Sequence, residues 1–337
     1  MTSIKNNFSL KSFNSFGLEV KASLFANPQT AEELPETLQT YDISKFPFMV
    51  VGEGSNLLFT GDFEGLILHP EIKGIEIIDE NEEEVIVSAG AGENWDNLVK
   101  YCVENAWYGL ENLSLIPGSV GSAPVQNIGA YGVELKDRME YLEAYDLREK
   151  RFVKLNGHAC EFGYRTSIFK GKCANRYIIT QIVFRLGKKP KFLLDYGNVR
   201  KVFQENKGET LQDLRDTIIN IRETKLPDPK KYGNAGSFFK NPIIGKPTFK
   251  CIRVQFREIP SYHAKDNMVK IPAAWLIEKA GWKGKRIGNV GTWPDQPLVI
   301  VNYGGATGKE ILEFSEMISV DIEKKFNISL EREVNVV

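Results

Sequence analysis

Cysteine and histidine are scarce in this chain, which has only four of the first and three of the second among 337 residues. The cysteines form no CxxC pair, and the histidines are scattered: Cys102, Cys160, Cys173 and Cys251; His69, His158 and His263. Because a structural zinc site needs clustered thiolates and imidazoles, we expect no metal site. We expect reduced, mostly buried thiols, as in a cytoplasmic protein.

Long apolar runs and an excess of one charge are also absent. Stretches such as FPFMVVG (46–52) have the length of a strand, far below the ~20 residues of a membrane span. The first residues, MTSIKNNFSLKSFNSFG, contain no apolar signal region, so we expect no secretory signal. Lys and Arg number 43 and Asp and Glu 44, so the net charge is −1. We therefore expect a protein that binds neither nucleic acid nor membrane.

The common nucleotide motifs are missing, but glycine is concentrated in two loops. Neither GEGSNL (52–57) nor GAGENW (90–95) completes GxGxxG, and GxxxxGK[ST] is absent, so neither a Rossmann site nor a P-loop is supported. The loops are GEGSN (52–56) and IPGSVGSAPVQNIGAYG (116–132). Their backbone N–H groups could bind phosphate. Compact surface loops that use glycine for turns are an equal alternative.

Strand and helix patterns alternate in the first half. FMVVGEGSN predicts a buried strand that enters a glycine turn, residues 177–186 alternate as a strand, and DENEEE (79–84) reads as an exposed connection between strands. Residues 85–107 predict a strand, a glycine turn and a helix, and 211–225 predict a second helix. The apolar faces expected for these helices are Trp95, Leu98, Val99, Cys102 and Ala106; Leu211, Leu214, Ile218 and Ile221.

Proline separates this half from the rest. Pro227 and Pro229 force an extended path, which places a domain boundary near residue 222. Beyond it, IPAAWLIEKAG (271–281) predicts a short helix, and Thr307 with Glu310 forms a capping-box pattern that opens a helix to about residue 326. The final ISLEREVNVV alternates like a strand, with Ile328, Leu330, Val334 and Val336 on one face and Glu331, Glu333 and Asn335 on the other.

An ordered set of motifs over nearly the whole chain resembles the family of UDP-N-acetylenolpyruvoylglucosamine reductases, the flavoenzymes of bacterial peptidoglycan precursor synthesis. The motifs are NSFG, VGEGSNLLF, AGENW, GLENLSLIPGSVGSAPVQNIGAYGVEL, FGYRTSIF, TKLPDPK, GNAGSFFKNP and LEREV. The resemblance implies an α+β protein with a two-lobed FAD-binding region of the vanillyl-alcohol-oxidase type and a C-terminal α/β substrate-binding domain. We expect FAD lobes at 1–73 and 74–222, a substrate domain at 223–326, and a strand at 327–337 that returns to the active site.

The resemblance also implies the reaction. NADPH gives a hydride to non-covalently bound FAD, and the reduced flavin gives a hydride to the enolpyruvyl CH2 carbon of UDP-N-acetylglucosamine enolpyruvate, so that UDP-N-acetylmuramate forms. We expect a cytoplasmic monomer. The two glycine loops would hold the FAD pyrophosphate and border the flavin ring, with these cofactor contacts: Gly52, Gly54, Ser55, Asn56, Leu57, Pro117, Gly118, Gly121, Ser122, Asn127 and Gly129.

Three residues match the catalytic positions of the family. Arg165 in FGYR suits a planar carboxylate, because a guanidinium stays charged and forms two parallel hydrogen bonds. Ser237 in GNAGS matches the proton donor to the carbanion, a transfer that a water-excluded site favours. Glu333, the second glutamate of LEREV, matches the third residue, and Glu331 is its near neighbour. Taken singly, they would read as a surface arginine, a turn serine and a solvated glutamate.

Substrate contacts follow from the same resemblance. They fall on Tyr196, Lys225, Asn241, Tyr262 and Lys283, with the lysines near the diphosphate. Tyr262 resembles the tyrosine of the loop that closes over substrate in the first subtype of the family. Relatives often carry arginine where this chain has Asn335, which puts a supporting contact near Glu333 in doubt.

Two other classes stay open. One is an oxidase of the same fold with covalently attached flavin, which flavin release on denaturation would exclude. The other is a nucleotide-binding module without catalysis, which bleaching of flavin absorbance by NADPH would exclude.

Overall fold

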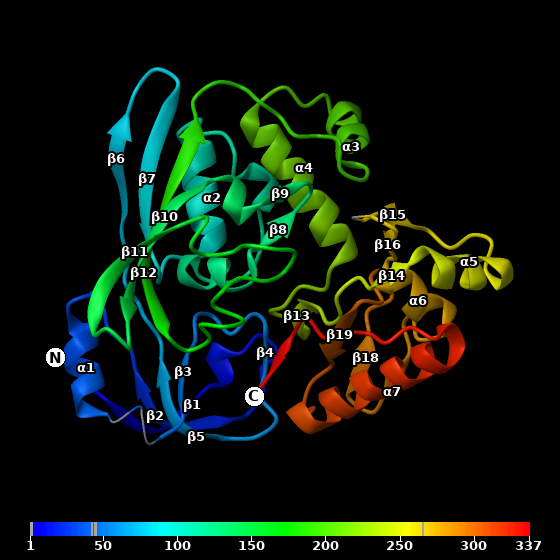
Figure 1. The fold of residues 1–337 in the computed structure, drawn as a ribbon, viewed down its shortest axis with the longest axis horizontal. Coiled ribbons are helices and arrows are strands. Elements are labelled where there is room, and N and C mark those ends of the chain that lie inside the picture. Colours follow the sequence, from blue (N-terminus) through cyan, green and yellow to red (C-terminus); the bar gives the residue numbers. More distant parts are fainter. Residues whose placement is uncertain (1–2, 42, 44–45, 265) are drawn as a thin grey trace. The chain divides into compact units, whose positions relative to one another are not determined.

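The computed structural model describes residues 3–41, 43, 46–264 and 266–337. The chain forms two compact units, each built from several segments (Figure 1). The first consists of Met1–Phe8, Ala22–Glu53 and Phe63–Arg222, and the second of Ser9–Lys21, Gly54–Asp62 and Glu223–Val337. The two FAD lobes expected at 1–73 and 74–222 thus fall mostly within one unit, and two short N-terminal segments belong to the other.

The strands of the first unit form a small sheet and a larger one. The small sheet has the order β1-β2-β5-β3, and β5 lies parallel to β2 and β3. The larger sheet has the order β11-β10-β12-β7-β6, with antiparallel neighbours throughout. The strands are β1 (Lys5–Ser9), β2 (Lys21–Ala26), β3 (Phe48–Val50), β5 (Phe63–Leu68), β6 (Ile75–Glu80), β7 (Glu84–Gly90), β10 (Met139–Asp146), β11 (Arg151–Asn156) and β12 (Tyr177–Gly187), with a hairpin of β8 (Gly129–Ala130) and β9 (Val133–Glu134).

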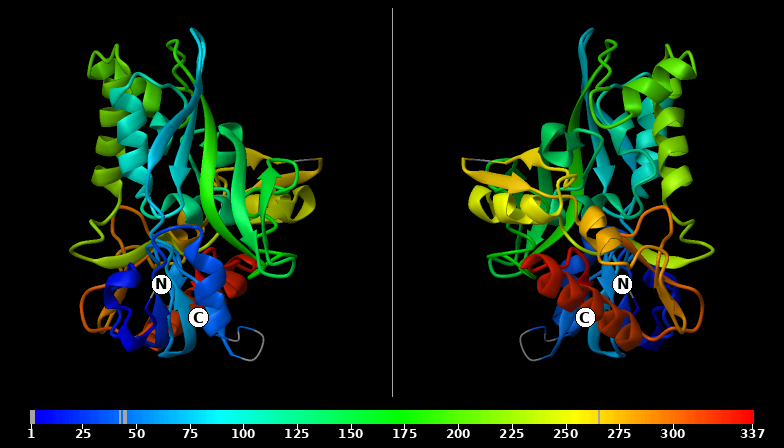
Figure 2. Two further views of the ribbon diagram at one scale, coloured as in Figure 1. Left: turned by 90° about the vertical axis from the view of Figure 1, so that its left-hand side faces the viewer. Right: turned by 90° about the vertical axis from the view of Figure 1, so that its right-hand side faces the viewer.

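Helices α2 (Trp95–Glu104) and α4 (Leu211–Lys225) lie on the same side of the larger sheet (Figure 2). Both were predicted from their periodicity, and the prediction is confirmed for all expected apolar positions but one. Ala106 lies beyond the end of α2, is exposed and has a φ of 55°, because Asn105 already caps the helix. The remaining helical elements of this unit are α1 (Glu33–Thr40), α3 (Val199–Glu205), η2 (Glu111–Leu113), η3 (Val120–Gln126) and η4 (Leu135–Asp137).

The second unit is built on the sheet β13-β19-β18-β17. Helix α7 packs against β18 and β19, and α6 packs against α7. A three-stranded sheet, β14-β16-β15, adjoins α5. The expected capping box is confirmed: the Thr307 hydroxyl accepts from the Glu310 N–H, and the Glu310 carboxylate accepts from the Thr307 N–H. The elements are η1 (Lys11–Phe13), β4 (Leu57–Leu58), β13 (Gly233–Ser237), β14 (Ile243–Gly245), α5 (Lys246–Gln255), β15 (Tyr262–His263), β16 (Met268–Lys270), α6 (Ala273–Lys279), β17 (Arg286–Ile287), β18 (Val290–Thr292), β19 (Val299–Asn302), α7 (Gly308–Phe326) and β20 (Asn335–Val336).

The C-terminal strand is shorter than the alternation predicts. Only β20 forms a strand, parallel to β4. Val334 and Val336 were expected on one face, but Val334 is buried and Val336 is exposed. Before it, the backbone makes single hydrogen bonds to residues 238–240 instead of a continuous ladder. The extended strand was therefore a wrong prediction, since the partner segment changes from residues 238–240 to 56–58 along these few residues.

The four thiols are free. Burial raises the pKa of Cys102 and of Cys160 to about 12, so both stay protonated at neutral pH. Cys173 is half-buried, and Cys251 on α5 is exposed. Two of the four thiols are therefore buried, whereas most were expected to be. Within the described ranges, no helix is long and apolar enough to cross a membrane.

Candidate functional site

A cavity of about 140 Å³ opens in the first unit beside both glycine loops. Three of the residues predicted to contact a cofactor line it, namely Gly52, Gly121 and Ser122. The others in its wall are Val50, Pro70, Ala91, Ser119, Val125, Phe169, Cys173, Asn175, Tyr177 and Ile179. The cavity thus joins a patch of small residues and hydroxyls to an apolar wall, which is the composition expected of a ligand pocket.

Glycine is required where the loops meet. A Cβ atom on Gly52 would lie 2.3 Å from the Ser119 Oγ, and one on Gly121 would lie 2.6 Å from the Ala91 Cβ. The Gly121 N–H also donates to the Ala91 carbonyl over 2.8 Å. The absence of side chains therefore lets backbone segments from three parts of the chain approach one another around the cavity.

The Glu53 carboxylate joins the two loops. Its Oε1 accepts from the Asn94 Nδ2 at 2.7 Å, and its Oε2 accepts from the Gly118 N–H at 3.0 Å. Gly118 has a φ of 130°, a backbone conformation that favours glycine. Gly118, which was predicted to contact the cofactor, therefore donates its N–H to a carboxylate of the protein itself. This hydrogen bond helps to set the distance between the two loops.

The remainder of the first glycine loop belongs to the second unit. Gly54 has a φ of 62°, and a Cβ there would lie 1.9 Å from the Phe13 carbonyl oxygen. The Asn56 Nδ2 donates to the Glu333 carbonyl at 3.2 Å, and the Asn56 carbonyl accepts from the Asn335 N–H at 3.1 Å. Ser55 lies between Gly54 and Asn56, and Leu57 begins β4. This part of the loop thus holds the C-terminal segment that carries Glu333.

Asn127 fixes the second glycine loop from within. Its side chain is fully buried, and its φ is 45°. The Nδ2 donates to the Glu134 carboxylate and the Gly163 carbonyl at 2.9 and 3.1 Å, and the Oδ1 accepts from the Lys136 N–H at 3.1 Å. Protein groups thus engage both ends of the amide, and these hydrogen bonds hold the shape of the loop around Asn127.

Arg165 lies against the same loop. Its Nη2 donates to the Gly129 carbonyl at 2.7 Å, and its own φ is 55°. A Cβ on Gly129 would lie 3.1 Å from the Arg165 Nη1, so glycine leaves room for the guanidinium. Arg165 is thus held in an uncommon backbone conformation, as functional residues often are.

Pro117 lies at the start of the loop, between Leu115, whose φ is 58°, and Gly118.

Ser237 and Glu333 lie on adjacent backbone segments of the second unit. Ser237 ends β13 opposite Val299, after an irregularity in the strand at which Gly236 has a φ of 68°. The carbonyl of the following residue, Phe238, accepts from the Glu333 N–H at 2.9 Å. Both side chains are half-buried.

The neighbouring Glu331 has a different environment. Its carboxylate is 72% exposed and pairs with the Lys240 ammonium, whose side chain is only 17% exposed. Lys240 was not among the predicted site residues. The FFK run that contains it carries no signal that separates a lysine paired with protein from one that awaits a ligand.

The residues expected to contact substrate are distributed over both units. Tyr196 is 58% exposed and packs edge-on against Tyr131 in the first unit. In the second unit, Tyr262 on β15 is 60% exposed, and Lys283 pairs with Glu278 at 3.3 Å. Lys225 is exposed at the end of α4, and the Asn241 Oδ1 accepts from the Ala273 N–H at 2.9 Å at the start of α6.

Several cavity residues were missed from the sequence. Tyr177 and Ile179 alternate along a strand that was predicted, but both faces of this strand are largely buried, so the pattern does not indicate which face meets a cavity. Phe169, Cys173 and Asn175 come from a segment of turns. Phe169 ends the FGYRTSIF motif but was given no role, and no motif included Cys173 or Asn175.

Similarity to known proteins covers the whole chain. Residues 22–154 match the family described as "FAD binding domain", and residues 228–337 match "UDP-N-acetylenolpyruvoylglucosamine reductase, C-terminal domain". Proteins named UDP-N-acetylenolpyruvoylglucosamine reductase from Bacteroides fragilis and Amoebophilus asiaticus are 42% and 44% identical over 334 and 336 residues. The alignments cover 99% of this chain and 100% and 99% of those proteins.

A solved structure has the same fold. The UDP-N-acetylenolpyruvylglucosamine reductase from Thermus caldophilus superimposes with a TM-score of 0.70 at 22% identity, and the match covers 100% of this chain and 98% of that one. This likeness agrees with the expected α+β class and extends over both units.

The loop geometry predicts a cost for removing the Asn127 amide. Asn127→Ala should lower the free energy of unfolding by about 1–3 kcal/mol, because three hydrogen bonds of a buried side chain to Glu134, Gly163 and Lys136 are lost. Urea denaturation would measure this, with Asn105→Ala as the matched control: Asn105 is exposed, and its Nδ2 donates to the Tyr101 carbonyl of its own helix. Equal effects of the two substitutions would contradict the inference that Asn127 fixes the second glycine loop.

Proposed function

Because this chain belongs to the UDP-N-acetylenolpyruvoylglucosamine reductase family, we propose that it reduces the enolpyruvyl ether of UDP-N-acetylglucosamine to the lactyl ether of UDP-N-acetylmuramate, with FAD as cofactor and NADPH as hydride donor. The observation that carries the proposal is the 2.9 Å hydrogen bond from the Glu333 N–H to the Phe238 carbonyl, which sets the segment of Glu333 beside that of Ser237.

The cavity beside the glycine loops fits a part of FAD. Its small residues and hydroxyls, Gly52, Gly121 and Ser122, suit the pyrophosphate, which needs close backbone approach. Its apolar wall suits an aromatic ring. FAD bound there would supply the hydride chemistry that links NADPH to the substrate carbon.

Arg165 binds and orients the substrate carboxylate. Negative charge develops next to this carboxylate when a hydride adds to the CH2 carbon, and a guanidinium stabilises that charge without changing its protonation. The Arg165 Nη2 donates to the Gly129 carbonyl, which holds the plane of the guanidinium group.

Ser237 gives the proton that completes the reduction. The CH2 carbon becomes a methyl group, the carbon–carbon double bond is lost, and the neighbouring carbon takes the proton of the Ser237 Oγ. The serine then regains a proton from water. A hydroxyl is a weak acid, but a carbanion is a strong base, and a site that excludes water makes the transfer feasible.

Glu333 acts next to the substrate carboxylate. Two bare carboxylates repel each other, so Glu333 either holds a proton or lies against Arg165 when substrate is bound. Asn335, where relatives often have arginine, donates from its Nδ2 to the Asn56 carbonyl at 3.3 Å. The supporting contact here is thus to backbone rather than to a carboxylate.

The substrate contacts follow from exposure and charge. Lys225 and Lys283 meet the diphosphate, and Lys283 exchanges its pairing with Glu278 for that contact. Tyr196 and Tyr262 are exposed enough to cover the bound sugar nucleotide, and Asn241 anchors the start of α6 beside it.

Ser237→Ala should separate the two halves of the reaction. Bleaching of the flavin absorbance by NADPH needs no proton from Ser237 and should stay within a few-fold of wild type. The return of absorbance on adding the enolpyruvyl sugar nucleotide should slow by about 10²–10⁴-fold, the usual contribution of a general acid. Stopped-flow absorbance without oxygen measures both.

Ser237→Cys provides the matched variant. A thiol also donates a proton, so part of the second rate should return. If Ser237→Ala slowed both halves equally, the residue would shape the pocket, and the proton donor would lie elsewhere.

The two terminal glutamates should differ sharply. Glu333→Gln should slow the substrate-dependent half by about 10²-fold or more, because it alters a group at the reacting carboxylate. Glu331→Gln should leave this rate near wild type, since its carboxylate is exposed and pairs with Lys240. Steady-state turnover of both variants would test this, and the reverse order of effects would exchange their roles.

A further inference from the structure

Helix α4 carries two buried arginine groups on one face. Arg215 is 5% exposed, and Arg222 follows seven residues later, which is two helical turns. The apolar residues of α4 pack into the core and fix the helix: Leu211, Leu214, Ile218 and Ile221. Arg215 reaches one end of the second glycine loop through Asp96, and Arg222 contacts Tyr131 at the other end.

The entry to the loop is held through Asp96. The Arg215 Nη1 and Nη2 donate to the two Asp96 carboxylate oxygens, both at 2.8 Å. The same carboxylate accepts from the Leu115 N–H at 2.5 Å. Burial acts to raise the pKa of Asp96, but the hydrogen bonds from Arg215 and Leu115 outweigh it and lower the pKa, so the carboxylate stays charged. Leu115 has a φ of 58° and directly precedes Ile116.

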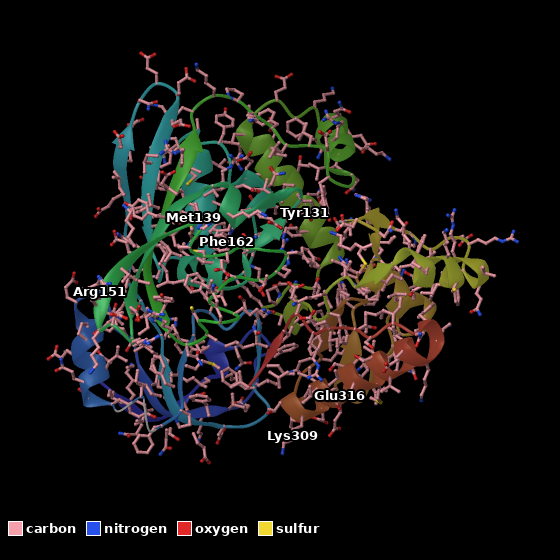
Figure 3. The ribbon with its side chains drawn as sticks, viewed as in Figure 1. Tyr131, Met139, Arg151, Phe162, Lys309 and Glu316 are labelled. Carbon is pink, nitrogen blue, oxygen red and sulfur yellow. The ribbon has the colours of Figure 1, made fainter. Side chains whose placement is uncertain are left out.

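The exit from the loop is held by Arg222. Its guanidinium donates to the Tyr131 hydroxyl. Tyr131, labelled in Figure 3, has a φ of 48°, and its carbonyl accepts from the Asn112 Nδ2 at 2.9 Å. Within the described residues, the buried Arg222 Nε has no hydrogen-bond partner. A buried N–H donor without a partner costs free energy, so the hydrogen bonds within the protein alone do not explain why an arginine is buried at this position.

The two ends share one unusual feature. Leu115 and Tyr131 are L-residues with left-handed backbone, a conformation that costs free energy and persists only where the surroundings enforce it. A side chain from α4 lies next to each of them: Arg215 pairs with the Asp96 carboxylate that accepts from the Leu115 N–H, and Arg222 donates to the Tyr131 hydroxyl. Without these contacts, the loop between them would relax toward ordinary backbone conformations.

We propose that Arg215 and Arg222 are positioning residues that hold the glycine loop 116–132 in its cofactor-binding conformation, acting from α4 through Asp96 and Tyr131. This inference rests on the proposed placement of FAD at that loop. It gives α4 a role in FAD binding although α4 contributes no residue to the lining of the cavity.

The test compares release of FAD from the holoenzyme in matched variants. Arg215→Gln removes the forked pair with Asp96, and Tyr131→Phe removes only the hydroxyl that accepts from Arg222. Asp216→Asn is the control, because Asp216 lies on the exposed side of α4 and accepts from the Gln212 Nε2 at 2.7 Å. Flavin fluorescence that appears on dilution gives the release rate. Arg215→Gln should raise this rate by about tenfold or more, as expected when a hydrogen bond to a charged group is lost.

Tyr131→Phe should raise the rate several-fold with little change in packing, so it decides the question if Arg215→Gln folds poorly. Hydrogen–deuterium exchange supplies the readout that a merely structural role would not give. Exchange should increase in residues 115–131 and stay unchanged in β7, β10 and β12. Release rates within twofold of wild type in both variants, or an equal rise of exchange in these strands, would overturn the inference.

Gly121→Val distinguishes this failure from failure of the proposed site. Its Cβ would collide with Ala91 at the cavity wall. If Gly121→Val lost FAD while the α4 variants kept it, only the positioning role would be wrong. If Gly121→Val also retained FAD normally, the placement of FAD at the loop would be wrong.

Discussion

The Glu53 carboxylate is the contact on which the candidate cofactor site depends. It accepts from the Asn94 side chain and from the Gly118 N–H, and so joins the first glycine loop to α2 and to the second loop. Charge-assisted hydrogen bonds of this kind are short and directional, so they fix the spacing of the segments that they join. The residues that follow Glu53 pass into the second unit, where Asn56 contacts the segment of Glu333. One short loop therefore lines the cavity with Gly52 and contacts the C-terminal segment that carries Glu333 through Asn56.

Uncommon backbone conformations recur where function is proposed. Arg165, Leu115 and Tyr131 have positive φ without being glycine. The Leu115 N–H donates to Asp96, the Arg165 Nη2 donates to the Gly129 carbonyl, and the Tyr131 carbonyl accepts from Asn112. Such conformations are stable only when packing and hydrogen bonding enforce them. Contacts within the protein therefore hold these three residues in their conformations.

The sequence was sufficient for features that depend on local periodicity and local sterics. It predicted α2, α4 and the capping box of α7, because apolar spacing and cap residues act over a few positions. It could not predict that residues 9–21 and 54–62 join the second unit, nor that Arg215 pairs with Asp96 across 119 residues, because tertiary packing alone decides these contacts. The C-terminal strand failed for a related reason: alternation describes a side-chain pattern, whereas the ladder depends on a partner that changes after a few residues. Motif resemblance supplied the roles of Ser237 and Glu333, and the structure adds that their segments are hydrogen-bonded neighbours.

The most direct test of the account is a two-step anaerobic titration of the purified protein. NADPH should bleach the absorbance of the bound FAD, and the subsequent addition of UDP-N-acetylglucosamine enolpyruvate should restore it, with one equivalent of UDP-N-acetylmuramate formed for each flavin reoxidised. If NADPH bleached the flavin and the sugar nucleotide left it bleached, the chain would be a flavoprotein that acts on a different substrate, and the roles given to Arg165, Ser237 and Glu333 would be wrong.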